Sequence, residues 1–571
     1  MKTKNNSIIL NSFGGIDHTK SNNDIHSASN IINYRILNDG SLEKRQGFRY
    51  VCDLGGTVRT FFVNTVNGRY TLFALIGNEV FEIDAKNGEK TLLGSIESTE
   101  GNACFFFFRE ILYLLDGKGI YEYIDGAFRP TIGYVPLVAK DWSNNIVGKI
   151  NEPRNILNRH ARATYRMTDS PSGFLCLDAP IASVEAIYVN GGLIDSSRYH
   201  INNDLKFINV TGLYEDDVIE VFFTYENGLD TLYARLCSST SSALFGGIGS
   251  TRLFICGGNG TGTVFSTKSI QAAELSTSKK QYPSSTELYF PLGYEFNAGD
   301  GINAVQAVIR QYSHVLIFTE GDVWMVTPDD DGSEYATTTS VNARIGCPVE
   351  QGVALSDNNP ISIGKHSVLS WETSSQNKCT ATNISRPIAD ELSEKWLSDS
   401  RIYYDVMRNE LWLYNRLYST VWVYNTVIKA WYKFDGIVAD EIFDLDGSVA
   451  FIKGSKLYVF DNECKLDIYE NGTAVYISAS YVTNYSDLGT SKVKTLSDIT
   501  LRADLFSENL HIGFTDNSKK TSDFLFYDEK NSQNSLITAR FPTGRFKHGA
   551  ITLDSHSSAR QKIHSITLNI R

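Results

Sequence analysis

The feature that most constrains the fold is an alternation of apolar and polar residues with period two, interrupted at Gly, Asn or Asp. Successive side chains of a strand point to opposite faces, so this pattern is typical of half-buried β-strands joined by tight turns. A loose unit of two short apolar strands and a polar turn recurs, at a spacing of roughly 35–55 residues where consecutive units can be compared. The units are residues 77–88, 111–126, 251–267, 314–332, 409–436 and 449–463.

This repeat predicts an all-β protein built around a β-propeller of about seven blades. A single unit is a small antiparallel sheet that cannot bury both of its faces, whereas radial stacking buries the faces and protects the strand edges. Large aromatic residues recur at equivalent points and would fill the space between blades: Tyr121, Trp324, Trp412, Trp422 and Trp431. A row of β-sandwiches without ring closure is the alternative arrangement.

Two segments depart from the repeat. Residues 173–225 contain turn signals at Asn190–Gly191 and Asn203–Asp204 between apolar runs, which predicts an inserted small β-domain. Residues 474–571 alternate without the blade pattern, which predicts a C-terminal β-sandwich. The expected division is 1–55 as an extended N-terminal arm and first strand, 56–169 and 229–472 as the two parts of the propeller, 170–228 as the insert and 473–571 as the sandwich.

Helical periodicity is scarce. The best candidate is residues 385–397, where Ile388, Leu392 and Trp396 follow one another at intervals of four, and a weaker candidate is 266–278. The longest apolar run, residues 104–115, is split by Arg109 and Glu110, so it is too short and too charged to span a bilayer. The first residues lack the apolar stretch of a secretory signal.

The charge balance is acidic. The chain has 65 Asp and Glu against 53 Lys and Arg, a net charge of −12. A protein that grips nucleic acid needs a basic surface, so this balance argues against gripping and leaves open a protein that lets nucleic acid pass. Basic residues gather near the C-terminus, and they could form either a solvated face or a surface that docks to an acidic neighbouring subunit. They are Arg540, Arg545, Lys547, Arg560, Lys562 and Arg571.

The first fifty residues carry a resemblance to a known family. An apolar start with two glycines is followed by a stretch of small residues and then by the text DGSLEKRQGF. This segment is similar to the opening of the tail nozzle proteins of short-tailed bacteriophages, also called tail tubular B or packaged-DNA stabilization proteins. Gln46 stands where the family has Pro, which could loosen the turn. The positions that match are Phe13, Gly14, Gly15, Asn30, Asn33, Asp39, Gly40, Ser41, Leu42, Lys44, Arg45, Gly47 and Phe48.

The resemblance implies a structural virion protein, folded in the host cytoplasm and located in the phage tail. Such proteins form homo-oligomeric rings, usually hexamers, below the portal and adaptor, and contact other tail proteins and fibres. The ring retains packaged double-stranded DNA and conducts it during ejection, and an acidic lumen would let the DNA slide. The residues expected to dock onto an adjacent subunit or ring are Asn30, Asn33, Asp39, Gly40, Leu42, Arg45, Gly47 and Phe48. The Gly- and Ser-rich residues 238–250 are candidates for a mobile gate.

No sequence motif points to catalysis, a cofactor or a metal. GGNGTG at residues 257–262 precedes strand text rather than the helix that would hold a phosphate. The acidic residues 329–334 lack the spacing of a calcium loop and are expected to form a solvated turn, as His548, His556 and His564 are expected to be surface histidines. The eight cysteines have no CxxC spacing and are expected to be mostly buried free thiols.

The alternatives are a propeller-based, tail-associated carbohydrate-active enzyme and a host-surface binding module. Cleavage of a glycosidic bond needs two carboxyl groups in one cleft. Candidates by composition are Asp216, Asp217, Asp444 and Asp446, although nothing in the sequence distinguishes them from turn residues.

Overall fold

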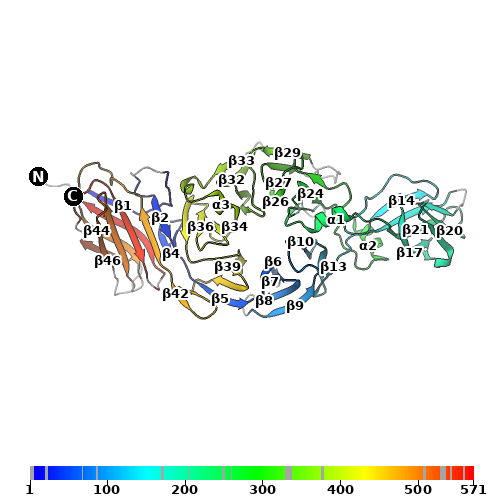
Figure 1. Ribbon diagram of the computed structural model, residues 1–571, viewed down its shortest axis with the longest axis horizontal. Coiled ribbons are helices and arrows are strands. Elements are labelled where there is room, and N and C mark those ends of the chain that lie inside the picture. Colours follow the sequence, from blue (N-terminus) through cyan, green and yellow to red (C-terminus); the bar gives the residue numbers. More distant parts are fainter. Residues whose placement is uncertain are drawn as a thin grey trace.

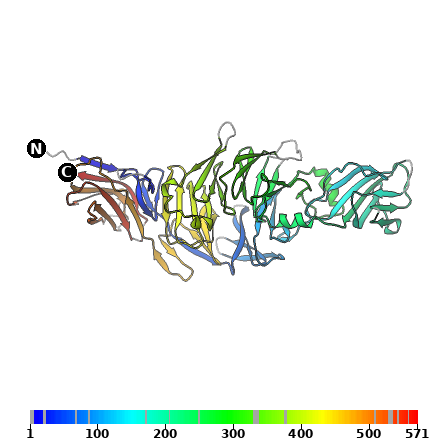
Figure 2. The ribbon, with the colours of Figure 1, turned by 45° about the horizontal axis from the view of Figure 1, so that its top comes forward.

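The computed structural model describes residues 6–19, 24–66, 69–84, 88–168, 173–204, 206–246, 251–258, 260–327, 337–373, 379–505, 509–526, 535–540, 543–556, 558 and 560–571. The chain is nearly all β, as predicted, and has three parts in a row (Figure 1). A ring of small sheets lies in the middle, an inserted β-domain lies on one side, and a β-sandwich that holds both chain termini lies on the other. The same order is visible after a 45° turn (Figure 2).

Seven four-stranded antiparallel groups follow one another around the ring. Five groups are separate four-stranded sheets and two occur within larger sheets, one of these with β5 as its outer strand. The groups are β6 (Val58–Val66), β7 (Arg69–Ile76), β8 (Glu79–Asp84) and β9 (Lys90–Ser95); β10 (Cys104–Phe108), β11 (Ile111–Leu115), β12 (Ile120–Ile124) and β13 (Ala127–Pro130); β22 (Ser241–Phe245), β23 (Arg252–Cys256), β24 (Thr263–Ser266) and β25 (Phe296–Asn297); β26 (Val305–Gln311), β27 (His314–Thr319), β28 (Val323–Thr327) and β29 (Thr337–Asn342); β30 (Val353–Ser356), β31 (Asn359–Ile363), β32 (Val368–Thr373) and β33 (Cys379–Asn383); β34 (Ser400–Asp405), β35 (Glu410–Asn415), β36 (Val421–Asn425) and β37 (Ala430–Phe434); and β38 (Glu441–Leu445), β39 (Ser448–Lys453), β40 (Lys456–Phe460) and β5 (Phe48–Asp53).

Hydrophobic clusters between neighbouring groups close the ring. The first strands of successive groups lie beside one another from β6 to β38. The last group then packs against the first, where Leu72 and Ala74 share a buried cluster with Phe443 and Leu457. The N-terminal strand β5 pairs antiparallel with β40, so residues from both ends of the ring segment build the same sheet. We interpret these groups as the blades of a propeller-like ring.

Most of the expected repeat units coincide with the middle strands of these groups. The group β30–β33 lies between two expected units, in a stretch where the sequence repeat predicts none. Of the aromatic residues expected between sheets, Trp412, Trp422, Trp431 and Tyr121 are buried and Trp324 is half-buried.

The inserted domain is larger than predicted. It combines a five-stranded and a three-stranded sheet, and the Asn190–Gly191 turn does connect two of its strands, with positive φ at both residues. Its first strands lie at 137–166, a stretch expected to belong to the propeller. They belong to the insert because β15 pairs with β21, and local turn signals do not reveal this distant partner. Its elements are β14 (Leu137–Ser143), β15 (His160–Arg166), β16 (Phe174–Cys176), β17 (Ile181–Val189), β18 (Gly192–Leu193), η1 (Ser196–Arg198), β19 (Tyr199–Asn202), β20 (Phe207–Val210) and β21 (Val218–Tyr225).

The C-terminal sandwich is present, but N-terminal strands complete both of its sheets. For residues 1–55 the prediction was an extended arm and a first strand. Strand β5 agrees with the second part, but the arm is wrong for the described residues before it, because β1 and β4 pair with β49, and β2 joins β43 to β37 of the ring. One sheet contains β2 (Ala28–Ile32), β43 (Ala479–Thr483), β48 (Gly549–Ser555), β45 (Leu510–Asp516) and β46 (Thr521–Phe526). The other contains β1 (Asn6–Leu10), β3 (Tyr34–Ile36), β4 (Leu42–Lys44), β49 (Lys562–Ile570), β44 (Leu496–Asp504) and β47 (Ser535–Arg540). The hairpin β41 (Leu466–Ile468) and β42 (Ala474–Tyr476) adjoins β5.

The helices are short. The helix expected over 385–397 is broken into η2 (Arg386–Ile388) and α3 (Glu394–Ser398), because the Ser393 side chain caps a new helix start. The helix expected over 266–278 is α2 (Ala272–Lys279), and α1 (Asp230–Cys237) was not predicted. No helix of the described residues is both long and apolar enough to cross a membrane.

Candidate functional site

The residues that carry the family resemblance meet at the joint between the sandwich and the ring. Arg45 lies at the centre, following β4, and is buried. Its Nη1 and Nη2 donate to the two carboxylate oxygens of Asp467, on β41, at 2.9 and 2.7 Å. Its Nε donates to Asn33 Oδ1 at 2.8 Å, and its remaining bonds go to the main-chain oxygens of Gln46 and Asp435. One side chain thus ties together three segments that are distant in sequence.

A second buried ion pair lies next to the first. Arg35, on β3, pairs with Glu410 at the start of β35, and its Nη1 donates to Gln46 Oε1 at 3.2 Å. The Tyr432 hydroxyl donates to Glu410 Oε1 at 2.6 Å. Burial alone would lower the pKa of Arg35, but the facing Glu410 carboxylate raises it above its ordinary value. Gln46, the departure from the family pattern, therefore takes part in the network instead of loosening the turn.

Close backbone packing explains two further motif positions. A Cβ at Gly47 would lie 2.0 Å from the main-chain oxygen of Leu466, so only glycine fits there. Phe48, the next residue, makes edge-on contacts with Phe451 and Tyr469 at centroid distances of 5.0 and 5.3 Å. The motif thus places its glycine where two chain segments touch and its aromatic ring in the core of a blade.

The expected docking residues therefore lie mostly inside the chain. Leu42, Arg45 and Phe48 are at most 3% exposed, and Asn33 and Gly47 are buried as well. Their partners are residues of the same molecule, so the prediction that they dock onto another subunit is wrong for these five. Asn30 and Gly40 are half-buried, and Asp39 is exposed and paired with Lys562 at 3.1 Å.

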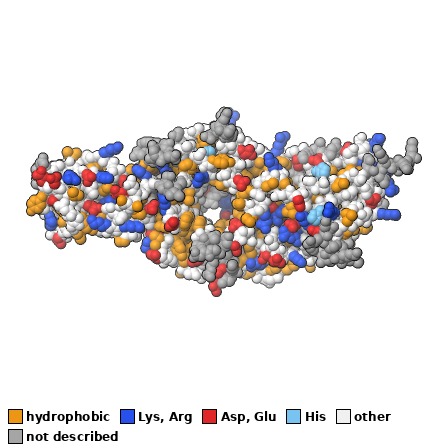
Figure 3. Space-filling model, turned by 180° about the vertical axis from the view of Figure 1, so that it is seen from behind, with side chains coloured by type: hydrophobic (Ala, Val, Ile, Leu, Met, Phe, Trp, Pro, Cys, Tyr) orange, Lys and Arg blue, Asp and Glu red, His pale blue; other side chains and the backbone are white. Residues whose placement is uncertain are grey.

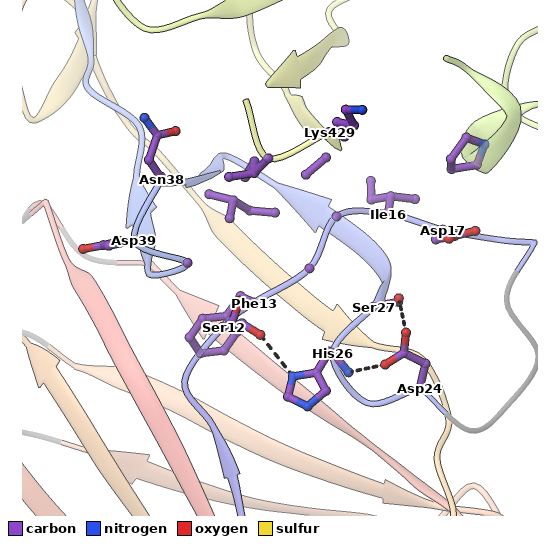
Figure 4. A pocket seen from close by; sticks show the side chains of 17 residues that line it. Ser12, Phe13, Ile16, Asp17, Asp24, His26, Ser27, Asn38, Asp39 and Lys429 are labelled. Carbon is purple, nitrogen blue, oxygen red and sulfur yellow. Dashed lines mark hydrogen bonds between the residues drawn. The ribbon is translucent and has the colours of Figure 1, made fainter. Parts of the chain in front are cut away.

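A pocket of about 360 Å³ lies beside this joint (Figure 4). The N-terminal turns that contain Phe13, Gly14 and Gly15 form one wall, and the β36–β37 turn with Lys429 forms the other. A Cβ at Gly14 would lie 2.2 Å from the main-chain oxygen of His26, so the paired glycines let two turns touch.

The carboxylates of this pocket are held by neighbouring groups. Asp24 accepts bonds from the main-chain N–H of His26 at 3.0 Å and from the hydroxyl of Ser27 at 2.8 Å (Figure 4). Asp17 accepts bonds from the main-chain N–H and the hydroxyl of Thr19. Across the described ranges, no group of three or more His, Cys, Asp or Glu is arranged to hold a metal ion.

The four acids considered for glycoside cleavage do not form one cleft. Asp216 and Asp217 belong to the insert, where Asp217 accepts bonds from the Asn190 side chain and the Tyr214 N–H. Asp444 and Asp446 lie at the end of β38 in the ring, where Asp446 has a positive φ in a hairpin turn. Asp216 and Asp446 thus lie in turns, as the sequence pattern also allowed, whereas Asp444 lies within a strand.

The other candidate segments lie partly outside the described residues. The whole acidic stretch 329–334 lies outside them, as do residue 259 of GGNGTG and residues 247–250 of the proposed gate. The described part of the gate segment is mainly β22, a strand of the ring. All eight cysteines are free thiols, and five are buried, as expected: Cys104, Cys176, Cys237, Cys256 and Cys347.

The sequence did not reveal the two carboxylates that pair with Arg35 and Arg45 at the joint. Glu410 and Asp467 lie in ordinary strand text, and their only distinguishing feature is a carboxylate at a buried strand position. The C-terminal cations are also partly accounted for: Arg560 Nη2 pairs with Glu43 at 2.7 Å and Lys562 pairs with Asp39.

Charged side chains of both signs are interspersed on the face drawn in Figure 3, and a group of Lys and Arg lies near its middle. The excess of acidic residues is therefore not concentrated on this face.

Comparisons with known proteins give only distant likenesses. No family model matches the chain, and no curated protein matches it. A structure titled "Crystal Structure of Mitotic Checkpoint Complex" has 8% identity and a TM-score of 0.34, covering 72% of this chain and 92% of the other. The AfRom2 CNH domain has 8% identity and a TM-score of 0.34, with coverages of 73% and 99%. PorZ, a surface component of the type-IX secretion system of Porphyromonas gingivalis, has 8% identity and a TM-score of 0.33, with coverages of 86% and 46%. Likenesses at these scores carry no argument about this chain.

Proposed function

We propose that this chain is a structural subunit of the tail nozzle or hub of a short-tailed bacteriophage. Copies form a homo-oligomeric ring that retains packaged double-stranded DNA and conducts it during ejection. The ring lies below the adaptor and portal and contacts other tail proteins and fibres. The net charge of −12 suits a lumen through which phosphates slide without being held.

The observation that carries this proposal is the buried joint around Arg45. The resemblance to nozzle proteins depends on an N-terminal motif. Its Asn33, Arg45, Gly47 and Phe48 make buried hydrogen bonds, an ion pair, a close backbone contact and aromatic contacts within this chain. A bidentate guanidinium–carboxylate pair and a glycine in backbone contact tolerate few substitutions. A motif that fastens a sandwich to a ring is what a load-transmitting subunit needs, and this role supports the family resemblance.

The architecture supports the same proposal. The insert and the sandwich extend from opposite sides of the ring (Figure 1), so one subunit offers separate surfaces to neighbours on two sides. The sheet that runs from β34 through β37, β2 and β43 to β46 crosses the joint without a break. A continuous sheet resists bending, which suits a subunit that has to withstand the pressure of packaged DNA.

Negative-stain electron microscopy of the purified full-length protein tests the proposal. Class averages should contain closed rings with an axial channel. A monomer that releases reducing sugar from a host-surface polysaccharide would instead support the carbohydrate-active alternative and would contradict the nozzle. A monomer that binds such a polysaccharide without cleaving it would favour the binding module.

A further inference from the structure

The charge of the chain is segregated along the sequence. Residues 474–571 contain twelve Lys and Arg against nine Asp and Glu, a net charge of +3, whereas residues 1–473 contain 41 against 56, a net charge of −15. Residues 1–47, which supply the N-terminal strands of the sandwich, contain six Lys and Arg against four Asp and Glu, so the acidic excess lies in the ring and insert.

Among the described residues of 474–571, six of the eight exposed Lys and Arg lie at the end of the sandwich farthest from the ring. Strand β49 runs from Lys562, which is paired with Asp39 at the joint, to the C-terminus, which Figure 1 places at the outer end of the molecule. We define the sandwich tip as residues 486–494, 516–520, 543–549 and 570–571. Its exposed cations are Lys492, Lys519, Lys520, Arg545, Lys547 and Arg571.

Acidic side chains at the tip do not balance these cations. Asp516 is buried and accepts bonds from the main-chain N–H groups of Ser518 and Lys520. Asp487 is half-buried and accepts a bond from the N–H of Gly489. Asp498, at the edge of the tip, is half-buried and bonded to Ser497 and Asn569.

A buried lysine holds the tip loops in place. Lys494 is 4% exposed, and its Nζ donates to the main-chain oxygens of Thr490, Lys492 and Lys547 at 2.7, 3.1 and 2.7 Å. All three ammonium protons are used, so the loops that carry Lys492 and Lys547 are fixed side by side before any partner arrives. A preorganised surface loses less entropy on binding than a mobile one.

A groove of about 580 Å³, lined by polar and apolar groups in similar shares, opens between these loops and the terminal strands. Ile8, Ile25, Leu488 and Ile570 line it, and Val493 beside them is 55% exposed. Lys492 and Arg571 line the same groove. Apolar side chains beside exposed cations suit a protein–protein contact, in which an apolar centre is surrounded by a polar rim.

We propose that the sandwich tip is a docking surface for the acidic ring-and-insert part of a second copy of this chain. The charge complementarity lies within one sequence, since the tip is basic and residues 1–473, which include the ring and the insert, carry −15. Such a contact is heterologous, because different surfaces of the two copies meet, and heterologous contacts generate rings when the rotation closes. The place of this contact in a ring rests on the proposed function. The contact itself can be measured separately, as self-association of the chain.

Sedimentation velocity of the full-length protein tests this contact at about 0.05 and 0.5 M NaCl, since salt screens exposed charges. The test variant is Lys492→Glu/Lys547→Glu, whose altered side chains are exposed and whose backbone contacts stay available. The matched control is Lys118→Glu/Lys140→Glu, which makes the same change in net charge at exposed positions on the ring and insert. We expect the wild type to associate at low salt and the control to associate at least as strongly, because its new carboxylates lie on the acidic partner part. The test variant should associate at least about tenfold more weakly than the wild type.

The possible outcomes distinguish the proposed docking contact from the proposed nozzle function. Unchanged association of the test variant, or a wild-type monomer at low salt, overturns the docking proposal, and rings that persist in the variant leave the nozzle standing. A salt-sensitive wild-type dimer that the test variant loses supports the contact and contradicts the ring. A shift of a short DNA duplex by wild type but not by the test variant, without self-association, would assign the tip to nucleic acid and overturn the proposal.

Discussion

Arg45 and Asp467 form a bidentate ion pair, with Nη1–Oδ1 and Nη2–Oδ2 distances of 2.9 and 2.7 Å. The pair connects the N-terminal segment that enters the ring to the hairpin that leaves it. Both side chains are at most 5% exposed. The pair therefore fixes the place where the chain passes between ring and sandwich.

Replacing Arg45 by Met should loosen this joint. The change leaves the Asp467 carboxylate buried without its partner, which typically costs about 3–5 kcal/mol. Hydrogen exchange of the amides in β4 and β41 measures the local free energy of opening. The control is Arg416→Met, which removes a more exposed pair with Glu441 and should cost about 0.2–1 kcal/mol. Equal effects of the two substitutions would contradict the role given to Arg45.

Gly47→Ala should lower the melting temperature. The added methyl group would lie 2.0 Å from the Leu466 main-chain oxygen, and overpacking of this kind costs about 1–3 kcal/mol. Gly544→Ala is the control, because a Cβ there meets no atom within 4 Å. Differential scanning calorimetry should therefore show a shift for the first variant and little change for the second.

The Asp39 carboxylate should lose its stabilising effect only in strong acid. Slight burial opposes its ionisation, but hydrogen bonds from Ser41 and the Lys562 ammonium lower its pKa to about 2. Because the folded pKa lies below the unfolded one, the stabilisation is present above about pH 4 and disappears as the pH falls through about 2. The melting temperatures of wild type and Asp39→Asn should differ at pH 6 and converge near pH 2. A constant difference across this range would show that Asp39 acts through something other than its charge.

Alkylation should divide the cysteines into two groups. Burial raises the pKa of Cys104, Cys237 and Cys347 to about 12, so these thiols are both inaccessible and protonated at neutral pH. The half-buried Cys52, Cys379 and Cys464 should react first with iodoacetamide in the folded protein. Peptide mass spectrometry reads the order, and early modification of Cys104 would mean that its sheet opens.

The sequence predicts what local patterns determine. Alternation and turn residues give the all-β class, the middle strands of most blades and the Asn190–Gly191 hairpin, because these depend on neighbours within a few residues. They cannot give the pairing of β5 with β40, or of β1 and β4 with β49, because those partners lie hundreds of residues away. For the same reason, the N-terminal motif was expected to reach another subunit, whereas its side chains pack within their own chain.

The location of the chain in virus particles tests the account most directly. Immunogold electron microscopy of purified short-tailed particles, with antibodies raised against this protein, should place gold at the distal end of the tail in intact particles. Particles of normal morphology that lack the chain, by both immunogold labelling and mass spectrometry, would contradict the account.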